Sequence, residues 1–208
     1  MSRLLHVIGS PRGDRSTSRA IAEAFLARYR AEHPDVEIDT LDLWTDPIPA
    51  FDGDRAAAKM TVIGGGTPEG AEATAWESIT AVFQRVDAAD HYLFGVPMWN
   101  GGIPWALKQL IDTITQPGMV FSFDPVNGYT GLLRDKKAAV IYTSGVYSPG
   151  VPPAFGRDFH STYFDDWLHF AGIEDIAEIR YQPTLLTETP DRDLARAIAE
   201  ATKLAATF

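Results

Sequence analysis

The chain has 208 residues, which is enough for one domain with a large core, and we expect a single domain over residues 1–208. Its 45% hydrophobic and 22% charged residues are typical of globular proteins, and no stretch approaches the roughly 20 apolar residues that a membrane-spanning helix needs. The absence of cysteine excludes a disulfide scaffold, thiol catalysis and thiolate-bound metals and favours a cytoplasmic location, while the formal net charge of −10 opposes binding to nucleic acid.

Strand-like and helix-like segments alternate along the chain. Nearly continuous apolar runs such as Leu4–Ile8 are expected for central strands of a parallel sheet that helices cover on both faces. The predicted strands are Leu4–Ile8, Val36–Leu41, His91–Val96, Ala138–Thr143 and Ile176–Tyr181. The predicted helices lie near Ser18–Glu32, Ala71–Arg85, Pro104–Thr115, Tyr163–Ala171 and Asp191–Ala206. We therefore predict an α/β fold with a doubly wound five-stranded parallel sheet, either of the dinucleotide-binding type or of the flavodoxin type with strand order 2-1-3-4-5.

The loop after the first strand is rich in hydroxyl groups and leads directly into a helix. Its hydroxyl-bearing residues are Ser10, Ser16, Thr17 and Ser18. Such a loop predicts a phosphate site, because free backbone N–H groups and the helix dipole favour an anion there. The alternative is that Ser16 or Thr17 only caps the helix. The loop contains neither the G-x-G-x-x-G dinucleotide fingerprint nor a Walker A motif.

Two further strands end in turns that suit a flat ligand. The third predicted strand runs into Pro97–Gly102, where Trp99 and Asn100 precede two glycines. These glycines let the main chain approach a ligand closely, although a plain turn with a core tryptophan explains the pattern as well. The fourth strand ends in the small polar turn Thr143–Tyr147. Ligands of open α/β sheets bind beyond the carboxyl ends of the strands, so the three turns together suit a mononucleotide such as FMN.

Other chemistries have weaker support. The chain has no G-x-S-x-G elbow for a serine hydrolase, and its five histidines show no paired spacing for a metal, so we predict no metal site. His6, inside a predicted strand, is interpreted as a core residue. The tryptophans interpreted as core or interface packing are Trp44, Trp76, Trp105 and Trp167. The glycine-rich segment Thr61–Gly70 is interpreted as a mobile loop near the site.

At this point the sequence resembles the FMN-dependent NADH:quinone oxidoreductases and azoreductases of the flavodoxin-like fold, over almost the whole chain. The matching blocks are S-P-R-G-D-R-S-T-S at Ser10–Ser18, P-M-W-N-G-G-I-P-W-A-L-K at Pro97–Lys108, G-M-V-F-S-F at Gly118–Phe123, G-L-L-R-D-K-K at Gly131–Lys137 and F-A-G-I at Phe170–Ile173. The second block is the most specific, because that family writes it as P-M-Y/W-N-F-x-I-P-x-x-L-K. The resemblance favours the flavodoxin type of sheet.

The resemblance implies roles for individual residues. Those implied to bind the FMN phosphate are Ser10, Ser16, Thr17 and Ser18. Those implied to hold the isoalloxazine and ribityl chain are Met98, Trp99, Asn100 and Gly101. The pyrimidine edge is implied to face Thr143, Ser144, Gly145 and Val146. On the substrate side, the resemblance implies Phe123 together with Phe170 from a second subunit, in a homodimer whose active sites lie at the interface.

The implied activity is a two-electron reduction that the flavin performs without a catalytic side chain. NADH or NADPH reduces FMN, and the flavin then reduces small aromatic acceptors, either quinones in one ping-pong cycle or azo compounds in two. Two alternatives stay open. One is a flavodoxin-like FMN electron carrier that passes single electrons to a protein partner. The other is an NADPH-preferring FMN or nitro reductase.

The chain departs from the family pattern in two places. Gly101 stands where the family commonly has phenylalanine, so the space above the flavin is either open or filled by a neighbouring side chain such as Trp105. Thr143-Ser144-Gly145-Val146 stands where the family commonly has Ser/Thr-Arg-Gly-Gly, so a cation is missing near the flavin. We expect these departures to affect acceptor preference and flavin potential, respectively.

Overall fold

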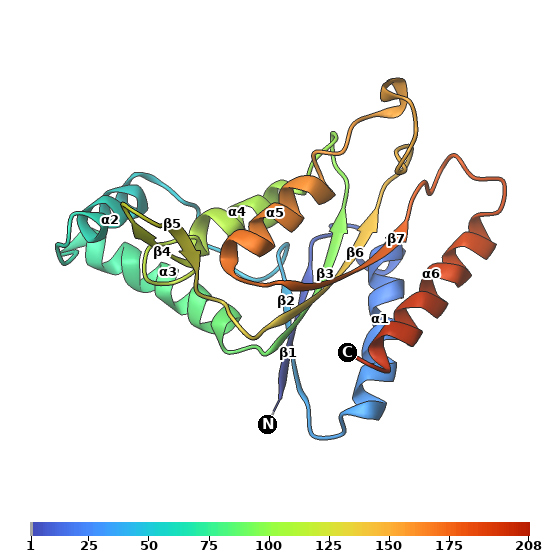
Figure 1. The fold of residues 1–208 in the computed structure, drawn as a ribbon, viewed down its shortest axis with the longest axis horizontal. Coiled ribbons are helices and arrows are strands. Elements are labelled where there is room, and N and C mark those ends of the chain that lie inside the picture. Colours follow the sequence, from blue (N-terminus) through green and yellow to red (C-terminus); the bar gives the residue numbers. More distant parts are fainter. Residues whose placement is uncertain (1) are drawn as a thin grey trace.

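The computed structural model describes residues 2–208, and its main sheet has five parallel strands in the order β2-β1-β3-β6-β7 (Figure 1). These strands are β1 Arg3–Ile8, β2 Glu37–Asp42, β3 His91–Pro97, β6 Lys137–Thr143 and β7 Asp175–Tyr181. Each predicted strand coincides with one of them to within a single residue at either end, so the five-stranded parallel sheet is confirmed. The predicted order 2-1-3-4-5 numbers only the five strands expected from the sequence, whereas the observed labels also number two hairpin strands. Two further strands, β4 Phe121–Asp124 and β5 Gly128–Gly131, form a separate antiparallel hairpin that the sequence analysis missed.

The predicted helices are confirmed, and one further helix is present. The α-helices are α1 Thr17–Glu32, α2 Gly53–Ile63, α3 Ala71–Asp87, α4 Trp105–Ile114, α5 Ser161–Ala171 and α6 Pro190–Ala205, and short 3-10 turns lie at Gly13–Arg15 and Pro153–Phe155. The interpretation of Thr61–Gly70 as a loop is wrong for residues 61–63, which complete α2. Asp52 starts this helix by accepting a hydrogen bond from the Arg55 N–H. None of the helices between residues 2 and 208 combines the length and apolar character that a membrane crossing requires.

Helices cover both faces of the main sheet, as predicted. On one face α1 and α6 lie side by side (Figure 1), and their apolar residues pack with Leu4, Leu93 and Ile141 of the sheet. On the other face α4 and α5 pack against a larger core that includes Leu5 and Tyr92. Neighbouring residues of one strand thus serve opposite cores, because side chains alternate across a strand. This is why the central strands are apolar at nearly every position.

Parallel pairing brings the ends of three strands to one edge of the sheet. Ile8 of β1 is in register with Gly95 of β3, and Pro97 is in register with Thr143 of β6. Just beyond β1, the Gly9 N–H donates to the Gly95 carbonyl at 3.0 Å. A Cβ on Gly9 would lie only 2.6 Å from that carbonyl oxygen, so the backbones approach this closely only with glycine. The turns that follow β1, β3 and β6 therefore lie next to one another.

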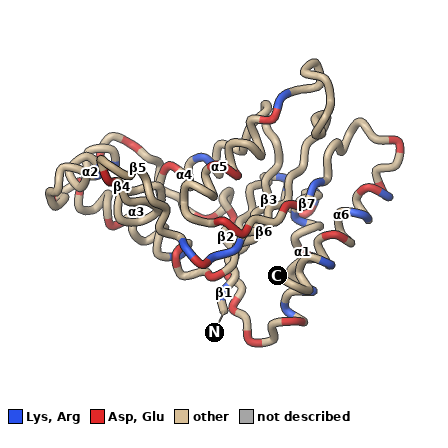
Figure 2. The backbone as a smooth tube through the Cα atoms, viewed as in Figure 1, with Lys and Arg blue, Asp and Glu red and all other residues tan. Residues whose placement is uncertain are grey.

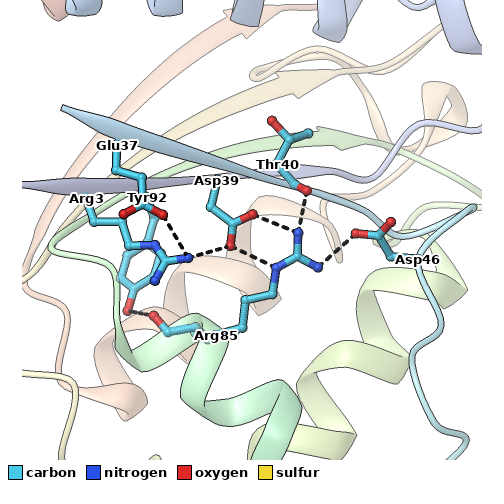
Figure 3. Close-up of polar contacts among 8 residues, drawn as sticks. Arg3, Glu37, Asp39, Thr40, Asp46, Arg85 and Tyr92 are labelled. Atoms are coloured by element: carbon cyan, nitrogen blue, oxygen red, sulfur yellow. Dashed lines mark hydrogen bonds and ion pairs between the residues drawn. The ribbon is translucent and has the colours of Figure 1, made fainter. Parts of the chain in front are cut away.

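A part-buried arginine fastens β2 to α3 (Figure 3). Arg85 donates to both carboxylate oxygens of Asp39 at 2.8 Å and to Asp46 at 2.9 Å. Arg3 of β1 adds a further contact to Asp39 at 3.2 Å. Hydrogen bonds from Arg85 hold the pKa of the Asp39 carboxyl below its ordinary value, despite the opposing effect of burial. Two-point contact with a planar guanidinium fixes geometry as well as adding energy.

The densest basic run, Arg134–Lys137, is engaged within the protein. The Lys136 ammonium donates to the carbonyl oxygens of Asp87 and Ala89, and Lys137 forms an ion pair with Asp175 at 3.3 Å. Acidic residues lie beside these lysines at the start of β6 (Figure 2). These contacts therefore attach the start of β6 to the segment before β3, through Lys136, and to β7, through Lys137.

Two glycines hold the β4–β5 hairpin against the end of α5. A Cβ on Gly131 would lie 2.3 Å from the Gly172 nitrogen, which is closer than any side chain permits. The Leu133 N–H donates to the Ala171 carbonyl at 2.8 Å just beyond the hairpin. An isolated two-stranded hairpin is marginally stable, so this backbone contact helps to determine where the hairpin lies.

We predict that Gly131→Ala lowers the free energy of unfolding by about 1–3 kcal/mol, because the added methyl group overpacks a backbone contact. Urea denaturation followed by circular dichroism measures this change. Gly53→Ala is the matched control, since no atom lies within 4 Å of a Cβ there, and it is expected to change stability by no more than about 1 kcal/mol. Equal stability of Gly131→Ala and the wild type would show that the hairpin moves aside without cost.

Candidate functional site

Three buried serines surround the N-terminus of α1. Ser10, Ser16 and Ser18 are exposed by only 5%, 4% and 2%, although each carries a hydroxyl group. Ser16 caps the helix, since its Oγ accepts from the Arg19 N–H at 3.3 Å and shares a hydrogen bond of 3.0 Å with the Ser18 Oγ. The capping interpretation of Ser16 is therefore confirmed, while Ser10 and Ser18 are not explained by it. A helix start with buried hydroxyl groups favours an anion.

The turn after β3 is closed by two hydrogen bonds between Trp99 and Gly102, of 2.9 and 3.0 Å. Its central residues, Asn100 and Gly101, have φ angles of +51° and +85°, a region that asparagine and glycine tolerate best. Trp99 is 47% exposed, so it is not a core tryptophan. Within residues 2–208, the N–H groups of Asn100 and Gly101 and the Asn100 side chain have no hydrogen-bond partner. The turn thus offers polar groups and an aromatic ring to a ligand.

The turn after β6 has its carbonyl groups occupied and its N–H groups open. The carbonyls of Ser144 and Gly145 accept from the N–H groups of Thr184 and Leu185, each at 2.8 Å. Across the described part of the chain, nothing accepts from the N–H groups of Gly145 and Val146. The two open N–H groups are hydrogen-bond donors that suit an electron-rich ligand edge.

A segment that the sequence analysis missed joins these two turns. In the 158–160 segment, the Phe159 N–H donates to the Gly101 carbonyl at 3.1 Å. The His160 Nε2 lies 2.8 Å from the Val96 carbonyl oxygen and donates to it, because a carbonyl only accepts. The 158–160 segment is therefore attached both to the strand β3 and to the turn that follows it.

Asp158 attaches the same segment to the turn after β6. Its Oδ1 accepts from the N–H groups of His160 and Ser161, at 3.0 and 2.7 Å. Its Oδ2 accepts from the Ser161 hydroxyl at 2.6 Å and from the Tyr147 hydroxyl at 3.3 Å. These hydrogen bonds outweigh burial and lower the pKa of the Asp158 carboxyl. The only sequence signal was an aspartate shortly before a predicted helix, which is typical of a cap.

His160 is a buried neutral base. Its ring is fully buried and packs edge-on against Tyr142, with ring centroids 4.8 Å apart. Burial is the main cause that lowers the pKa of His160 to about 4. The Nδ1 atom has no hydrogen-bond partner, as expected for the unprotonated nitrogen when Nε2 carries the proton. The histidine therefore acts as a neutral donor to the Val96 carbonyl.

A cavity of about 850 Å³ adjoins the turn after β3. Its aromatic lining residues are Trp44, Phe51, Trp99, Trp105, Phe159 and Tyr163. Trp105 is 67% exposed and packs edge-on against Trp44, so it does not belong to the core. The space beside Gly101 is bounded by Phe159, since a Cβ at position 101 would lie 3.9 Å from the Phe159 Cδ2. A neighbouring side chain, that of Phe159, therefore borders this space.

Phe123 and Phe170 lie elsewhere in the chain. They belong to an aromatic cluster on the hairpin and the end of α5, where Tyr129 lies between them with ring centroids 4.9 Å from Phe123 and 5.4 Å from Phe170. Neither phenylalanine lines the cavity beside Trp99. One chain thus brings together the residues around the three turns but not these two. The roles of Phe123 on the substrate side of the flavin and of Phe170 in the site of a second subunit stay predictions.

The remaining candidates have structural roles. His6 is 4% exposed, which confirms its interpretation as a core residue, and burial lowers its pKa to about 4. Lys108 and Asp112 form an ion pair along α4, at the rim of the cavity. Among residues 2–208 there is no group of three or more histidine and carboxylate side chains that would hold a metal ion.

The sheet order and the three turns at its carboxyl edge define a flavodoxin-like protein, and a family model described as "Flavodoxin-like fold" matches residues 2–205. The chain is 52% identical over 202 residues to an FMN-dependent NADH:quinone oxidoreductase of Ruegeria pomeroyi, covering 97% of this chain and 99% of the relative. It is 43% identical to FMN-dependent NADH:quinone oxidoreductase 9 of Burkholderia lata, covering 100% of both. A crystal structure of azoreductase from Bacillus anthracis superposes with a TM-score of 0.90 at 26% identity over 100% of both chains. The chain therefore belongs to the family of the FMN-dependent NADH:quinone oxidoreductases.

The low pKa of His160 predicts a pH dependence of stability. The unfolded histidine binds a proton near pH 6.5 and the folded one only near pH 4, so the free energy of unfolding falls as pH falls through this window. In His160→Gln the amide keeps a donor for Val96 but does not titrate, and stability should fall less steeply from pH 6.5 to 4. Urea denaturation at several pH values measures both slopes. His6 titrates equally in both proteins, so identical slopes would contradict the prediction.

Proposed function

We propose that this protein is an FMN-dependent oxidoreductase that transfers two electrons from NADH or NADPH to quinones and, in two cycles, to azo compounds. The observation that carries the proposal is the set of open N–H groups on the turns after β3 and β6, beside the buried serines of α1. The names of the relatives support the activity, since the Ruegeria pomeroyi protein is called an NADH:quinone oxidoreductase and the Bacillus anthracis protein an azoreductase.

The residues present fit FMN at one edge of the sheet. We propose that the phosphate binds to Ser10, Ser16, Thr17 and Ser18, where hydroxyl groups meet the start of α1. The isoalloxazine and ribityl chain are assigned to Met98, Trp99, Asn100 and Gly101. The pyrimidine edge is assigned to Thr143, Ser144, Gly145 and Val146. These segments follow β1, β3 and β6, and β1 and β6 pair with β3 on either side, so a single ligand is able to contact all of them.

Bound FMN supplies the redox chemistry, taking two electrons from the nicotinamide and giving them to an acceptor, so no side chain is proposed as catalytic. The chain binds the cofactor and orients its partners. The N–H groups of Gly145 and Val146 are placed to donate hydrogen bonds where negative charge develops on the pyrimidine edge. Trp99 and the aromatic cavity beside it offer flat surfaces on which an acceptor stacks. A single pocket that serves donor and acceptor in turn leads to ping-pong kinetics.

We further propose that the whole chain, residues 1–208, forms one domain and works as a homodimer. Phe170 from a second subunit, together with Phe123, would then enclose the substrate side of the flavin, since Phe170 does not line the cavity of its own chain. Small quinones fit the apolar, aromatic cavity as acceptors. The cytoplasmic location expected from the absence of cysteine stays a prediction.

An anaerobic titration with NADH tests the proposed function. Protein saturated with FMN and freed of excess cofactor should show a flavin absorbance that bleaches in one two-electron phase and recovers when 1,4-benzoquinone is added. NADPH in a parallel titration compares the two donors. A protein that binds FMN, ignores both donors and bleaches in two one-electron phases with dithionite would instead be an electron carrier. A protein that binds no FMN would contradict the site.

The phosphate assignment predicts a difference between FMN and riboflavin. Ser10→Ala and Ser18→Ala should weaken FMN binding by about 10-fold or more, because a hydrogen bond to a charged group contributes about 1.5–3 kcal/mol. Riboflavin has no phosphate, so its affinity should stay within about twofold of that of the wild type. Ser122→Ala, on the exposed hairpin strand β4, is the matched control. Quenching of flavin fluorescence measures both affinities. Equal losses for the two flavins would contradict the phosphate assignment.

A further inference from the structure

Phe159 has a fixed backbone and an exposed ring. Its N–H is bonded to Gly101, and the residues on either side are held by Tyr147 and by Val96. The ring itself is nevertheless 64% exposed. Most exposed phenylalanines need no special explanation, but this one lines the cavity beside the proposed flavin turn. The same hydrogen bonds that position that turn therefore fix the backbone from which the ring projects.

The cavity has the size and chemistry of a site for a flat, uncharged molecule. Its volume of about 850 Å³ lies within the range of small-molecule sites. The charged groups at its wall, Lys108 and Asp112, pair with each other and so offer no net charge to a ligand. Trp99 and Tyr163 line the cavity together with Phe159. Rings of this kind bind planar ligands by stacking or edge contacts.

The position of Phe159 relative to Gly101 makes the ring a boundary of the cavity. A Cβ on Gly101 would be in ordinary van der Waals contact with the Phe159 ring, at 3.9 Å. Because Gly101 itself has no side chain, Phe159 supplies the aromatic surface on this side of the turn. Any acceptor that extends past the turn into the cavity meets the ring.

We infer that Phe159 selects electron acceptors by size, by forming the wall against which the part of the acceptor beyond the flavin packs. The inference rests on the proposed function, because it names the residue that discriminates among quinones. A two-ring quinone gains a contact with Phe159 that a one-ring quinone is too short to make. Phe159 is thus a specificity residue and takes no part in electron transfer.

The test compares 1,4-naphthoquinone with 1,4-benzoquinone in wild type, Phe159→Ala and Phe159→Tyr. Binding is measured without NADH by quenching of tryptophan fluorescence, since Trp44, Trp99 and Trp105 line the cavity, and in FMN-loaded protein also by the change in flavin absorbance. Phe159→Ala should raise the dissociation constant of naphthoquinone about 5- to 20-fold and that of benzoquinone less than twofold. Phe159→Tyr should retain the wild-type preference. Phe155→Ala is the matched control, because Phe155 is 46% exposed nearby but does not line the cavity.

Steady-state kinetics and assembly complete the test. KM for naphthoquinone should rise with its dissociation constant, while KM for benzoquinone stays within about twofold of the wild-type value. An unchanged preference between the two quinones in Phe159→Ala would overturn the inference. So would a concentration-dependent loss of dimer in sedimentation, which would make the ring a contact with a second copy. Failure of the wild type to bind FMN would refute the proposed function, whereas quinone binding to the cavity would still be measured by tryptophan fluorescence.

Discussion

The parallel pairing of β3 with β1 on one side and with β6 on the other is the constraint on which the candidate site depends. Parallel strands deliver their carboxyl ends to one edge, and the register sets Ile8 beside Gly95 and Pro97 beside Thr143. The Gly9 backbone then approaches the Gly95 carbonyl more closely than any other residue permits. Three turns that are far apart in sequence are thereby placed within reach of one mononucleotide. No single turn identifies a binding site, and the candidate site arises because the three turns are adjacent.

Hydrogen bonding within the chain also decides which groups remain open at this edge. The carbonyls of Ser144 and Gly145 are occupied by the segment after β7, and the Gly101 carbonyl by Phe159. Four N–H groups on the same turns, those of Asn100, Gly101, Gly145 and Val146, are left without partners in residues 2–208. Open N–H donors of this kind favour an electron-rich ligand edge. Because Ser144 stands where the family commonly has arginine, the backbone N–H groups are the groups that offer partial positive charge to a ligand here.

Much of the fold follows from local sequence, and much of the site does not. The central strands β1, β3 and β6 are predicted to within a residue because buried parallel strands are apolar at almost every position. The hairpin carrying Phe123 escapes prediction because its position depends on Gly131 meeting Gly172, a contact between distant parts of the chain. The same holds for Phe159, because its hydrogen bond to Gly101 spans 58 positions and has no local signature in the sequence. Trp105 is considered from the sequence only because it follows the turn closely. The resemblance to a family predicts FMN as the cofactor, whereas the periodicity of the sequence does not determine the identity of the ligand.

Helix α5 connects the 158–160 segment with the β4–β5 hairpin. Its first residue, Ser161, is bonded to Asp158, and its last turn carries Phe170 and meets the hairpin at Gly172. Its 11 residues span about 16 Å as one rigid rod. In the proposed homodimer, this rod is the shortest covalent path from the acceptor wall of one chain to the ring that the chain offers its partner. Phe159 and Phe170 thus lie at opposite ends of one rigid element.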